Sequence, residues 1–353
     1  GGAEKLVVET VPLYQQAGIE TDVIVTNGSL FPFMQQLQAN HKGAIIALGN
    51  GSVYNPLVVF KLLRYIKRYD IIHVHLFPIQ YFVVLAKWLS GAKTKIIFTE
   101  HSTSNRRISK WYFKPIEQLI YNAYTKVICI TPEIKTIYEK YLPSLKNKWV
   151  VIQNGVATKK IHTAHSITVS EIHKTISTSD KLIIQVASFH EPKDQATLIK
   201  AIPLLPKEVK VLLVGEGVEK QKCQQLANDL GVADSVHFLG VRMDVPQLLK
   251  TADIVVLSSK YEGLSLSSIE GMASGKPFIA SNVPGLSDVV AGAGILFECG
   301  NEKQLAQHIQ ELLNDPLHYQ KTATACQERA QEYTIEKMVA AHIELYEHLV
   351  NEN

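Results

Sequence analysis

The sequence predicts an α/β protein built from two doubly wound parallel sheets. Short apolar runs recur along the chain and are separated by segments with helical periodicity, which is the pattern of a parallel sheet covered by helices on both faces. This series occurs twice, and a polar stretch lies between the two copies. With 353 residues, of which 46% are hydrophobic, the chain is long enough to form two separate cores.

The first series fills the N-terminal half of the chain. An initial helix is expected to start at the N-terminus. The apolar runs then predict strands at 21–26, 44–48, 71–76, 95–99 and 126–130, and the helical periodicity predicts helices at 31–38, 56–69, 79–89 and 114–123. Residues 151–156 are predicted to form a last strand and the turn that leaves this domain.

A change in composition marks the boundary between the halves. Residues 157–180 are rich in Thr, Ser, His and Lys and are predicted to connect the domains. The second series has predicted strands at 181–186, 209–215, 236–240 and 252–259, and predicted helices at 195–205, 218–230 and 245–251. The expected organisation is therefore a first domain at 1–156, a connection at 157–180 and a second domain at 181–334.

Charge and cysteine content exclude several classes of protein. The formal net charge of +3 is too small to indicate nucleic-acid binding. The four cysteines are scattered without metal-ligand spacing, which favours reduced, buried thiols in a cytosolic protein. No apolar run is long enough to span a bilayer, and no signal peptide is present in the sequence. We expect a cytoplasmic protein, with peripheral contact to the inner face of a membrane as an open alternative.

The stretch from Tyr261 to Pro277 carries the strongest functional signal. It follows a predicted buried strand, and Glu262 and Glu270 lie eight positions apart around a turn of glycine and serine that opens into a helix. The first backbone N–H groups of such a helix can hold an anion such as a diphosphate. The two carboxylates would repel a phosphate but accept hydrogen bonds from hydroxyls. Together they suit a nucleotide sugar, with one diol on each side of the phosphates.

This segment resembles the E-x7-E motif of the retaining glycosyltransferases of family four. The similarity continues through Gly275-Lys276-Pro277 and Pro284-Gly285-Leu286. The resemblance implies the GT-B fold, in which two Rossmann-like domains face one another across a cleft. It also implies that the last helix, at 335–353, packs back onto the first domain. The N-terminal domain would be on the acceptor side, and the C-terminal domain would bind the nucleotide sugar.

The resemblance assigns roles to residues in the second domain. Glu262 would hold hexose hydroxyls, and Glu270 would hold the ribose. Backbone groups of Gly263, Leu264 and Ser265 would contact the diphosphate. Family members usually place an arginine and a lysine after the first strand of this domain; Lys193 matches the lysine, whereas Ser188 stands at the arginine position. Losing a bidentate guanidinium would weaken stabilisation of the leaving group, so activity itself is in question.

In the first domain, the resemblance points to His101 and to the N-terminus. His101 follows the strand predicted at 95–99, and in similar proteins a histidine at the end of this strand contacts the donor sugar. Gly1 and Gly2 look like the glycine-rich turn that follows the first strand in the family, and that strand is absent from the sequence. We expect it to lie upstream in a longer protein; a rearranged sheet is the alternative. Arg106, beside Arg107, is a candidate for an acceptor phosphate.

Two other signals are weaker. Gly215-Glu216-Gly217 lacks the third glycine of a dinucleotide fingerprint and resembles instead a turn of the family's nucleotide domain, while residues 238–243 resemble the region that contacts the base. His73 and His75 share one face of a strand, but no further ligands are apparent, so we predict no metal site. Lys110 and Lys114, with the two arginines, would suit a membrane surface.

The resemblance implies transfer of a hexose-type sugar from a nucleoside diphosphate donor to a glycan or lipid-linked acceptor, in the synthesis of lipopolysaccharide, capsule or related glycans. No cofactor or metal is expected, because a lysine and a helix terminus take up the charge of the leaving group. No pair of carboxylates presents itself as nucleophile and acid, which agrees with a front-face mechanism. The open alternatives are a silent nucleotide-sugar-binding subunit and a sugar-nucleotide epimerase or hydrolase. An NAD-dependent oxidoreductase lacks its fingerprint.

Overall fold

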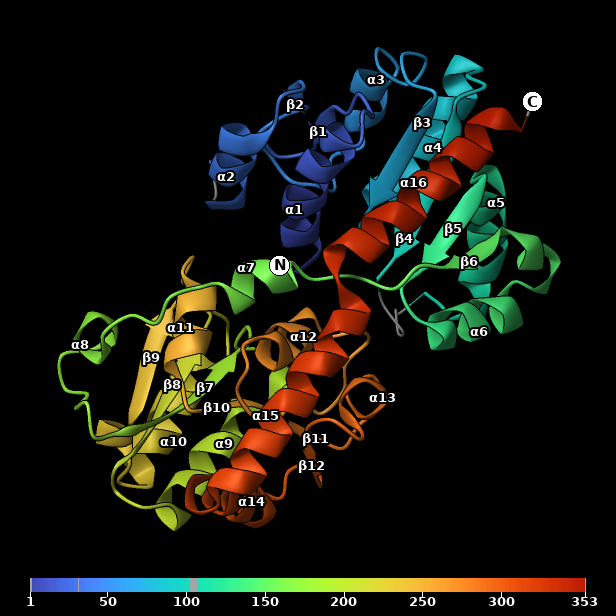
Figure 1. Cartoon of the computed structure of the whole chain (residues 1–353). Helices are drawn as coiled ribbons and strands as arrows, with labels where there is room; N and C mark the ends of the chain where they lie inside the picture. The colour runs from blue at the N-terminus through green and yellow to red at the C-terminus, as the bar shows by residue number, and fades with distance from the viewer. Residues whose placement is uncertain (1, 31, 102–106, 353) are drawn as a thin grey trace. The chain divides into compact units, whose positions relative to one another are not determined.

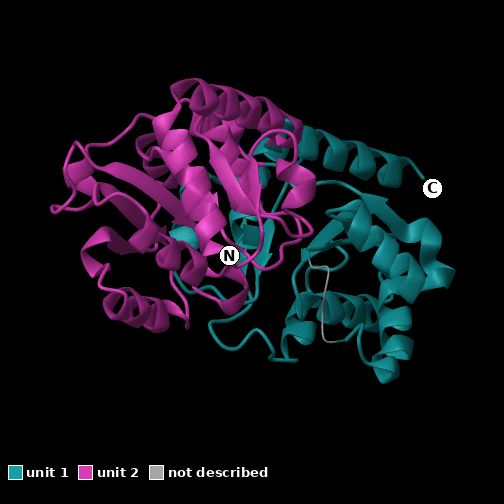
Figure 2. Cartoon of the chain, turned by 90° about the horizontal axis from the view of Figure 1, so that it is seen from below, with its two compact units in different colours: residues 1–155, 335–353 teal, residues 156–334 magenta. Residues whose placement is uncertain are grey.

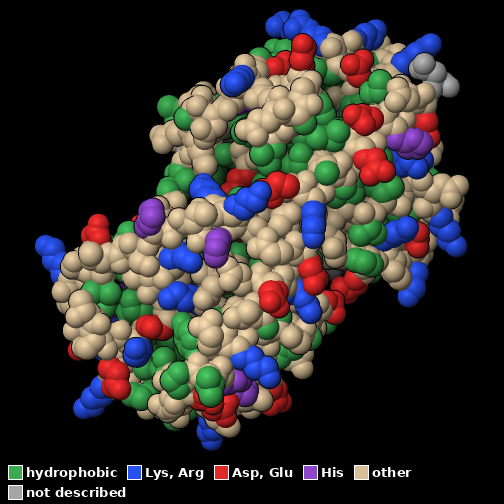
Figure 3. Space-filling model, viewed as in Figure 1, with side chains coloured by type: hydrophobic (Ala, Val, Ile, Leu, Met, Phe, Trp, Pro, Cys, Tyr) green, Lys and Arg blue, Asp and Glu red, His purple; other side chains and the backbone are tan. Residues whose placement is uncertain are grey.

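The computed structural model describes residues 2–30, 32–101 and 107–352. The chain divides into two compact units. Unit 1 comprises Gly1–Gly155 and Ile335–Asn353, and unit 2 comprises Val156–Thr334 (Figure 2). On the face seen in Figure 3, basic and acidic side chains are interspersed, in line with the small net charge.

The described residues of unit 1 form two parallel sheets, with strand orders β1-β2 and β3-β4-β5-β6. Its strands are β1 (Val23–Val25), β2 (Ile45–Ala47), β3 (Ile71–His75), β4 (Lys95–Glu100), β5 (Lys126–Cys129) and β6 (Trp149–Val151). Its helices are α1 (Gly2–Gln16), α2 (Pro32–Asn40), α3 (Val58–Leu62), α4 (Ile79–Ser90), η1 (Trp111–Phe113), α5 (Lys114–Ala123), α6 (Pro132–Tyr141), η2 (Pro143–Lys148) and α16 (Ile335–Asn351).

Alternate residues of the larger sheet face opposite helical layers. Ile97 and Ile128 pack with Leu349 of α16, which covers one face of this sheet (Figure 1). Their neighbour Phe98 points to the other face, where its ring lies 6.1 Å from Tyr121 of α5. The period of two along a strand therefore fixes which side each helix covers. In the described residues, the pairings of β3 with β4, of β4 with β5 and of β5 with β6 are all parallel.

Unit 2 contains one parallel sheet with strand order β12-β11-β10-β7-β8-β9. Its strands are β7 (Lys181–Val186), β8 (Val209–Val214), β9 (Val236–Gly240), β10 (Ile254–Leu257), β11 (Phe278–Ser281) and β12 (Ile295–Phe297). Its helices are α7 (Thr158–His162), α8 (Val169–Ile172), η3 (Glu191–Lys193), α9 (Gln195–Ala201), η4 (Ile202–Leu204), α10 (Lys220–Asp229), η5 (Ala233–Ser235), α11 (Val245–Thr251), α12 (Leu266–Ala273), α13 (Ser287–Val290), α14 (Glu302–Asn314), α15 (Pro316–Ala330) and η6 (Gln331–Tyr333).

Both faces of this sheet are covered, as predicted for a doubly wound fold. Helices α9, α10 and α14 pack on one face over a buried apolar cluster, while α12 contacts β10, β11 and α15. The parallel α/β architecture with two Rossmann-like sheets is thus confirmed. Because the strand order reverses between β7 and β10, the crevice beyond their carboxyl ends is the place where such sheets bind ligands.

Some segments differ from the sequence prediction. The predicted helix at 56–69 shortens to α3, which ends at Leu62 and is followed by turns. The predicted helix at 195–205 ends at Ala201 and continues as a 3-10 turn, because Pro203 has no N–H for the next helical bond. Residues 157–180, interpreted as a connection, lie instead in unit 2, where α7 packs against α11 and α12 with Ile161 buried.

Candidate active site

Two loops of unit 2 leave neighbouring strands at the point where the strand order reverses. One follows β7 and carries residues 187–194; the other follows β10 and carries residues 258–265. The sequence separates Lys193 from Glu262 by 69 positions, yet the fold brings both to this crevice. Lys193 and Glu262, both predicted site residues, are therefore adjacent at the place where open α/β sheets bind ligands.

The lysine and the glutamate form a close ion pair. Lys193 Nζ lies 2.6 Å from Oε1 and 2.8 Å from Oε2 of Glu262. The Glu262 side chain is only 8% exposed, whereas that of Lys193 is 27% exposed. Ser259 Oγ donates a third hydrogen bond, 2.7 Å long, to Oε1. A buried carboxylate needs hydrogen-bond donors such as the Lys193 ammonium and the Ser259 hydroxyl. The donor groups of a ligand, such as sugar hydroxyls, could take the place of either one.

Two buried polar residues hold the backbone beside Lys193. Gln185, at the end of β7, donates through Nε2 to the carbonyl oxygen of Lys193 at 2.9 Å. The Ser258 hydroxyl lies 2.7 Å from the carbonyl oxygen of Asp194 and 3.1 Å from Gln185 Oε1. Gln185 and Ser258 are almost completely buried. Neither Gln185 nor Ser258 was identified from the sequence. The available signals were a glutamine inside the apolar strand β7 and a serine directly after the apolar strand β10.

Helix α12 begins directly after the glutamate loop. Its N-cap is Ser265, whose side chain accepts a hydrogen bond from the N–H of Ser268, as the sequence predicts for a helix start. Gly263 and Leu264 form the approach to this cap, and Glu270 lies buried in the helix, 5% exposed. The segment therefore places a helix N-terminus immediately after Glu262, where the helix dipole favours an anion.

Ser188 lies in the loop after β7 and is exposed to solvent. Its carbonyl oxygen accepts a hydrogen bond of 3.1 Å from Gln195 Nε2. Lys260 Nζ forms an ion pair of 2.6 Å with Glu191, which is a second link between the two loops. The turn at Gly215 and Gly217 lies against the loop after β7, because the Phe189 N–H of that loop donates to the carbonyl oxygen of Glu216.

In unit 1, His101 follows the last residue of β4 and belongs to a group of histidines. Its Nε2 lies 3.3 Å from Nδ1 of His75. His73 lies between Thr99 Oγ1 and the Tyr346 hydroxyl, with ring nitrogens 2.6 Å from each. Burial lowers the pKa of His101 to about 4, and it lowers the pKa values of His73 and His75 well below the ordinary value. These rings are therefore neutral at pH 7.

A fourth residue completes this group, which we call the histidine cluster (His73, His75, His101 and His342). The ring of His342, on α16, lies 5.4 Å from the ring of His73, and its Nδ1 lies 2.6 Å from the Tyr14 hydroxyl of α1. Burial lowers the pKa of His342 to about 4. In the described part of the chain, no group of three or more His, Cys, Asp or Glu residues is placed to hold a metal ion.

Glu100, next to His101, was not singled out from the sequence. Its Oε2 accepts hydrogen bonds from the hydroxyls of Tyr121 and Tyr138, at 2.8 and 2.6 Å, and its residue is 6% exposed. The carboxylate is thus fixed under the strand end that carries His101. The tyrosines lie 21 and 38 positions away, so no local pattern marks this contact.

The predicted acceptor loop lies largely outside the described residues. Gly1 and Arg106 are not described, and Gly2 is the first residue of α1. Arg107 does not point to an open phosphate site: its Nε lies 3.1 Å from Glu117 Oε1, and its guanidinium lies 4.4 Å from the centre of the Phe77 ring. Glu117 is fully buried, and burial raises the pKa of its carboxyl to about 7.

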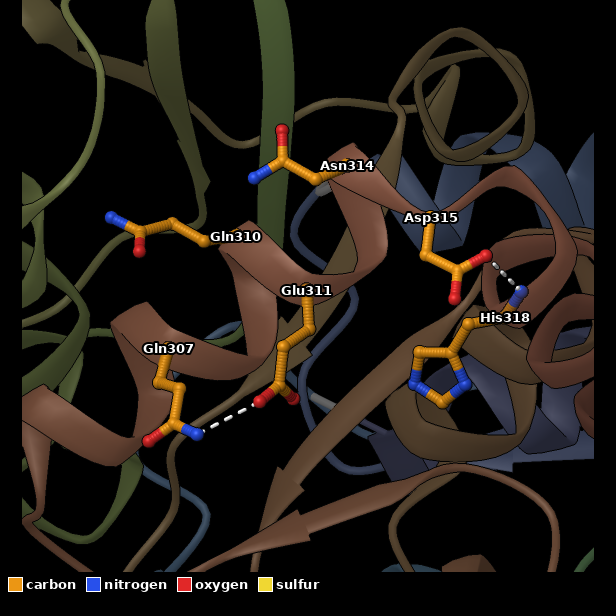
Figure 4. Close-up of a pocket in the computed structure, with 6 residues that line it drawn as sticks. All are labelled: Gln307, Gln310, Glu311, Asn314, Asp315 and His318. Atoms are coloured by element: carbon orange, nitrogen blue, oxygen red, sulfur yellow. Dashed lines mark hydrogen bonds between the residues drawn. The ribbon is translucent and has the colours of Figure 1, made fainter.

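A surface hollow lies elsewhere in unit 2. It is lined by Gln307, Gln310, Glu311, Asn314, Asp315 and His318, from α14 and the start of α15 (Figure 4). Its side chains are polar: Gln307 donates to Glu311, and Gln310 donates to the carbonyl oxygen of Leu204. None of them comes from the loops after β7 and β10, so the hollow is separate from the site described above.

Family models match both halves of the chain. A family model described as Glycosyltransferase Family 4 matches residues 1–160, and one described as Glycosyl transferases group 1 matches residues 169–333. N-acetyl-alpha-D-glucosaminyl L-malate synthase of Bacillus anthracis is 28% identical over 284 residues, which cover 78% of this chain and 74% of the relative. A second relative, from Escherichia coli, is a UDP-Gal:alpha-D-GlcNAc-diphosphoundecaprenol alpha-1,3-galactosyltransferase. It is 28% identical over 241 residues, which cover 64% of this chain and 61% of the relative.

Solved structures share the fold over almost the whole chain. The crystal structure of Anabaena Alr3699/HepE in complex with UDP and glucose has a TM-score of 0.82 at 21% identity, covering 98% of this chain and 95% of that one. A glycosyltransferase from Rickettsia africae also has a TM-score of 0.82, at 20% identity, covering 100% of this chain and 96% of that one. At these identities the likeness concerns the fold.

Proposed function

This chain belongs to family four of the glycosyltransferases and has the GT-B fold, and from this we propose which reaction it performs. The proposed reaction moves a hexose-type sugar from a nucleoside diphosphate sugar to an acceptor hydroxyl and retains the configuration at the anomeric carbon. The proposed product is a cell-surface polysaccharide or glycolipid. The solved Anabaena relative holds UDP and glucose, and the E. coli relative is named for UDP-Gal, which supports a nucleotide sugar as donor.

The observation that carries the proposal is the Lys193–Glu262 ion pair at the start of α12. In this pair each side chain neutralises the charge of the other. A bound donor would replace both halves of the pair: the diphosphate would take the ammonium group, and sugar hydroxyls would donate to the carboxylate. Glu270 would accept hydrogen bonds from the ribose, and the backbone of Gly263, Leu264 and Ser265 would face the phosphates.

Leaving-group stabilisation is the main chemical task in this proposal. As the bond from the anomeric carbon to the phosphate oxygen breaks, negative charge collects on the diphosphate and the sugar becomes oxocarbenium-like. Lys193 and the N-terminus of α12 would stabilise that charge from fixed positions. His101, neutral at pH 7, would contact a sugar hydroxyl as a hydrogen-bond partner rather than as a charged acid.

We propose that the reaction needs no metal ion, because Lys193 and the helix N-terminus supply the positive charge. Turnover is expected to be unchanged by a chelator and by added Mg²⁺ or Mn²⁺. Loss of turnover in the chelator that Mg²⁺ or Mn²⁺ restores would contradict this part of the proposal.

The decisive experiment combines binding and turnover. A thermal-shift screen of UDP, GDP, ADP and their common sugars is run on the parent and on Glu270→Gln, and product formation is then measured with the stabilising donor. We expect one nucleotide to stabilise the parent and to stabilise Glu270→Gln much less. NMR of the product should show the anomeric configuration of the donor. Stabilisation by no nucleotide, in folded protein, would overturn the proposal.

A second candidate function is a nucleotide-sugar-binding subunit without turnover. The exposed serine at position 188 favours it, because this is the position where similar proteins carry the arginine of the leaving-group site. The same experiment separates the two functions: stabilisation by a nucleotide without product, over a panel of glycan and lipid-linked acceptors, would favour the silent subunit.

A further inference from the structure

The outer surface of α4, η1 and α5 exposes large apolar side chains. On α4 these are Trp88 and Leu89, 44% and 65% exposed. On η1 and α5 they are Trp111, Tyr112, Ile116 and Leu119, and Trp111 is 84% exposed. We call these six residues the α4–α5 face. Isolated apolar side chains are normal on a surface, whereas a group of this size on adjacent helices indicates a binding surface.

The six side chains come from neighbouring elements of unit 1. Helices α4 and α5 contact each other, and the Tyr124 hydroxyl at the end of α5 donates to the carbonyl oxygen of Gln80 at 2.7 Å. The inner side of α4 is buried through Val83 and Val84, and that of α5 through Ile120 and Tyr121. Residues on the opposite sides of both helices therefore face solvent together.

Helix α5 has its polarity partly reversed. Glu117 is fully buried against Arg107, while Ile116 and Leu119, on either side of it in sequence, are about half exposed. An ordinary surface helix would bury the apolar residues and expose the carboxylate. Burial of Glu117 also removes the one negative charge that α5 could have presented on this surface.

The charged side chains that α4, η1 and α5 themselves expose are positive. Between residues 79 and 129 the acidic residues are Glu100 and Glu117, and both are buried. Basic side chains lie among the aromatic ones: Lys110 Nζ is 5.7 Å from the centre of the Tyr112 ring, and Lys114 is exposed at the start of α5. Lys87 lies on α4 beside Trp88 in sequence. Exposed tryptophan, tyrosine and lysine side chains, on helices that expose no carboxylate of their own, match the boundary of an anionic bilayer.

We propose that the α4–α5 face docks this protein on an anionic membrane surface. Trp111, Ile116 and Leu119 enter the boundary between headgroups and acyl chains, and Lys110 and Lys114 bind lipid phosphates. The proposal replaces the sequence-based one that relied on the two arginines, because Arg107 is held by Glu117 and Arg106 lies outside the described residues. Among the helices that the structure describes, none has the length and apolar character needed to cross a membrane.

The test is co-sedimentation with vesicles of phosphatidylcholine alone or mixed with phosphatidylglycerol. The parent is expected to bind only the mixed vesicles, and added salt should weaken the binding. Trp111→Ser with Ile116→Ser, and separately Lys110→Glu with Lys114→Glu, should each lower the vesicle affinity by about tenfold or more. All four residues are exposed, so unchanged circular dichroism should show that the variants fold.

Leu317→Ser with Lys321→Glu on α15 is the matched control, because Leu317 is as exposed as Trp111 and Lys321 is also exposed. This variant should bind like the parent. The proposal is overturned if the parent ignores the mixed vesicles, or if the control loses as much affinity as the α4–α5 variants. It is also overturned if sedimentation velocity shows that the face joins two copies of the chain. Since the readout is binding, its failure is distinguishable from failure of the proposed reaction.

Discussion

Gly285 lies directly against the main chain of Glu262. A Cβ atom at position 285 would stand 2.4 Å from the carbonyl oxygen of Glu262 and 2.2 Å from that of Gly263. The backbone at Gly285 also has a φ of +80°, which side chains with a Cβ rarely adopt. The turn that follows β11 therefore supports the loop that carries Glu262.

Gly285→Ala is expected to displace the Glu262 loop. The added methyl group cannot be accommodated without a backbone shift, so kcat should fall about a hundredfold, because misplacement by about 1 Å has effects of this size. Gly300→Ala is the matched control, since Gly300 has a φ of +77° with open space around it. Steady-state kinetics of both variants give the comparison. Equal losses in the two variants would show that backbone strain, rather than contact with Glu262, is responsible.

Ser188→Arg is expected to raise kcat by about tenfold or more, because a guanidinium there would add a donor for the departing diphosphate. Residue 188 is exposed, so the larger side chain has room. The measurement is kcat at saturating donor, with Ser188→Met as a control of similar length without charge. An unchanged kcat in the arginine variant would mean that position 188 does not reach the leaving group.

Ser258→Ala tests whether the Ser258 hydroxyl positions the backbone of Lys193 for catalysis in addition to stabilising unit 2. Removing the hydroxyl takes a donor from the Asp194 carbonyl, which should lower the unfolding free energy of unit 2 by about 1–3 kcal/mol. It should also lower kcat, because the Lys193 backbone loses its support. Ser274→Ala is the control: Ser274 is equally buried and donates to the Gly271 carbonyl at the other end of α12. We expect a comparable stability loss there without a change in kcat.

Unit 1 should lose stability as the pH falls. The folded-state pKa values of His101 and His342 are about 4, below the ordinary 6.5, so the unfolded chain binds more protons in between. The contribution of these histidines to the free energy of unfolding is fully present above about pH 6.5 and is lost toward pH 4. Each histidine loses about 1.4 kcal/mol for every pH unit between its folded and unfolded pKa values. Urea unfolding from about pH 7.5 to about pH 5 measures the slope.

His342→Gln is the informative variant for this prediction. A glutamine keeps an amide that can bond to the Tyr14 hydroxyl, but it does not titrate, so the slope of stability against pH should become shallower. Glu117 acts in the opposite direction, because its raised pKa makes the folded state bind more protons between pH 4.5 and about 7. A Glu117→Gln variant should therefore steepen the slope. A pH dependence that is the same in all three proteins would contradict this account.

The sequence predicted the local parts of the site better than their contacts. The turn at Gly263 and the N-cap at Ser265 follow from residue types over a few positions, and both strands that carry the loops were predicted. The Lys193–Glu262 pair was not predicted as a contact, because strand order is set by long-range packing. Gln185 was counted only as part of an apolar strand. Gln185 can bond to the Lys193 carbonyl only because the loop after β7 folds back over the end of the strand. The periodicity of the sequence does not reveal this fold of the loop.

The reversal of strand order in unit 2 also bears on how binding and folding are linked. β7, β8 and β9 form one half of the sheet and β10, β11 and β12 the other, and the halves meet through the pairing of β7 with β10. Lys193 belongs to the first half and Glu262 to the second, so a partly folded molecule with one half formed would lack part of the proposed donor site. A donor bound at the proposed site would therefore stabilise only the fully assembled sheet. It should slow hydrogen exchange equally in β8 and in β11, although neither strand carries Lys193 or Glu262.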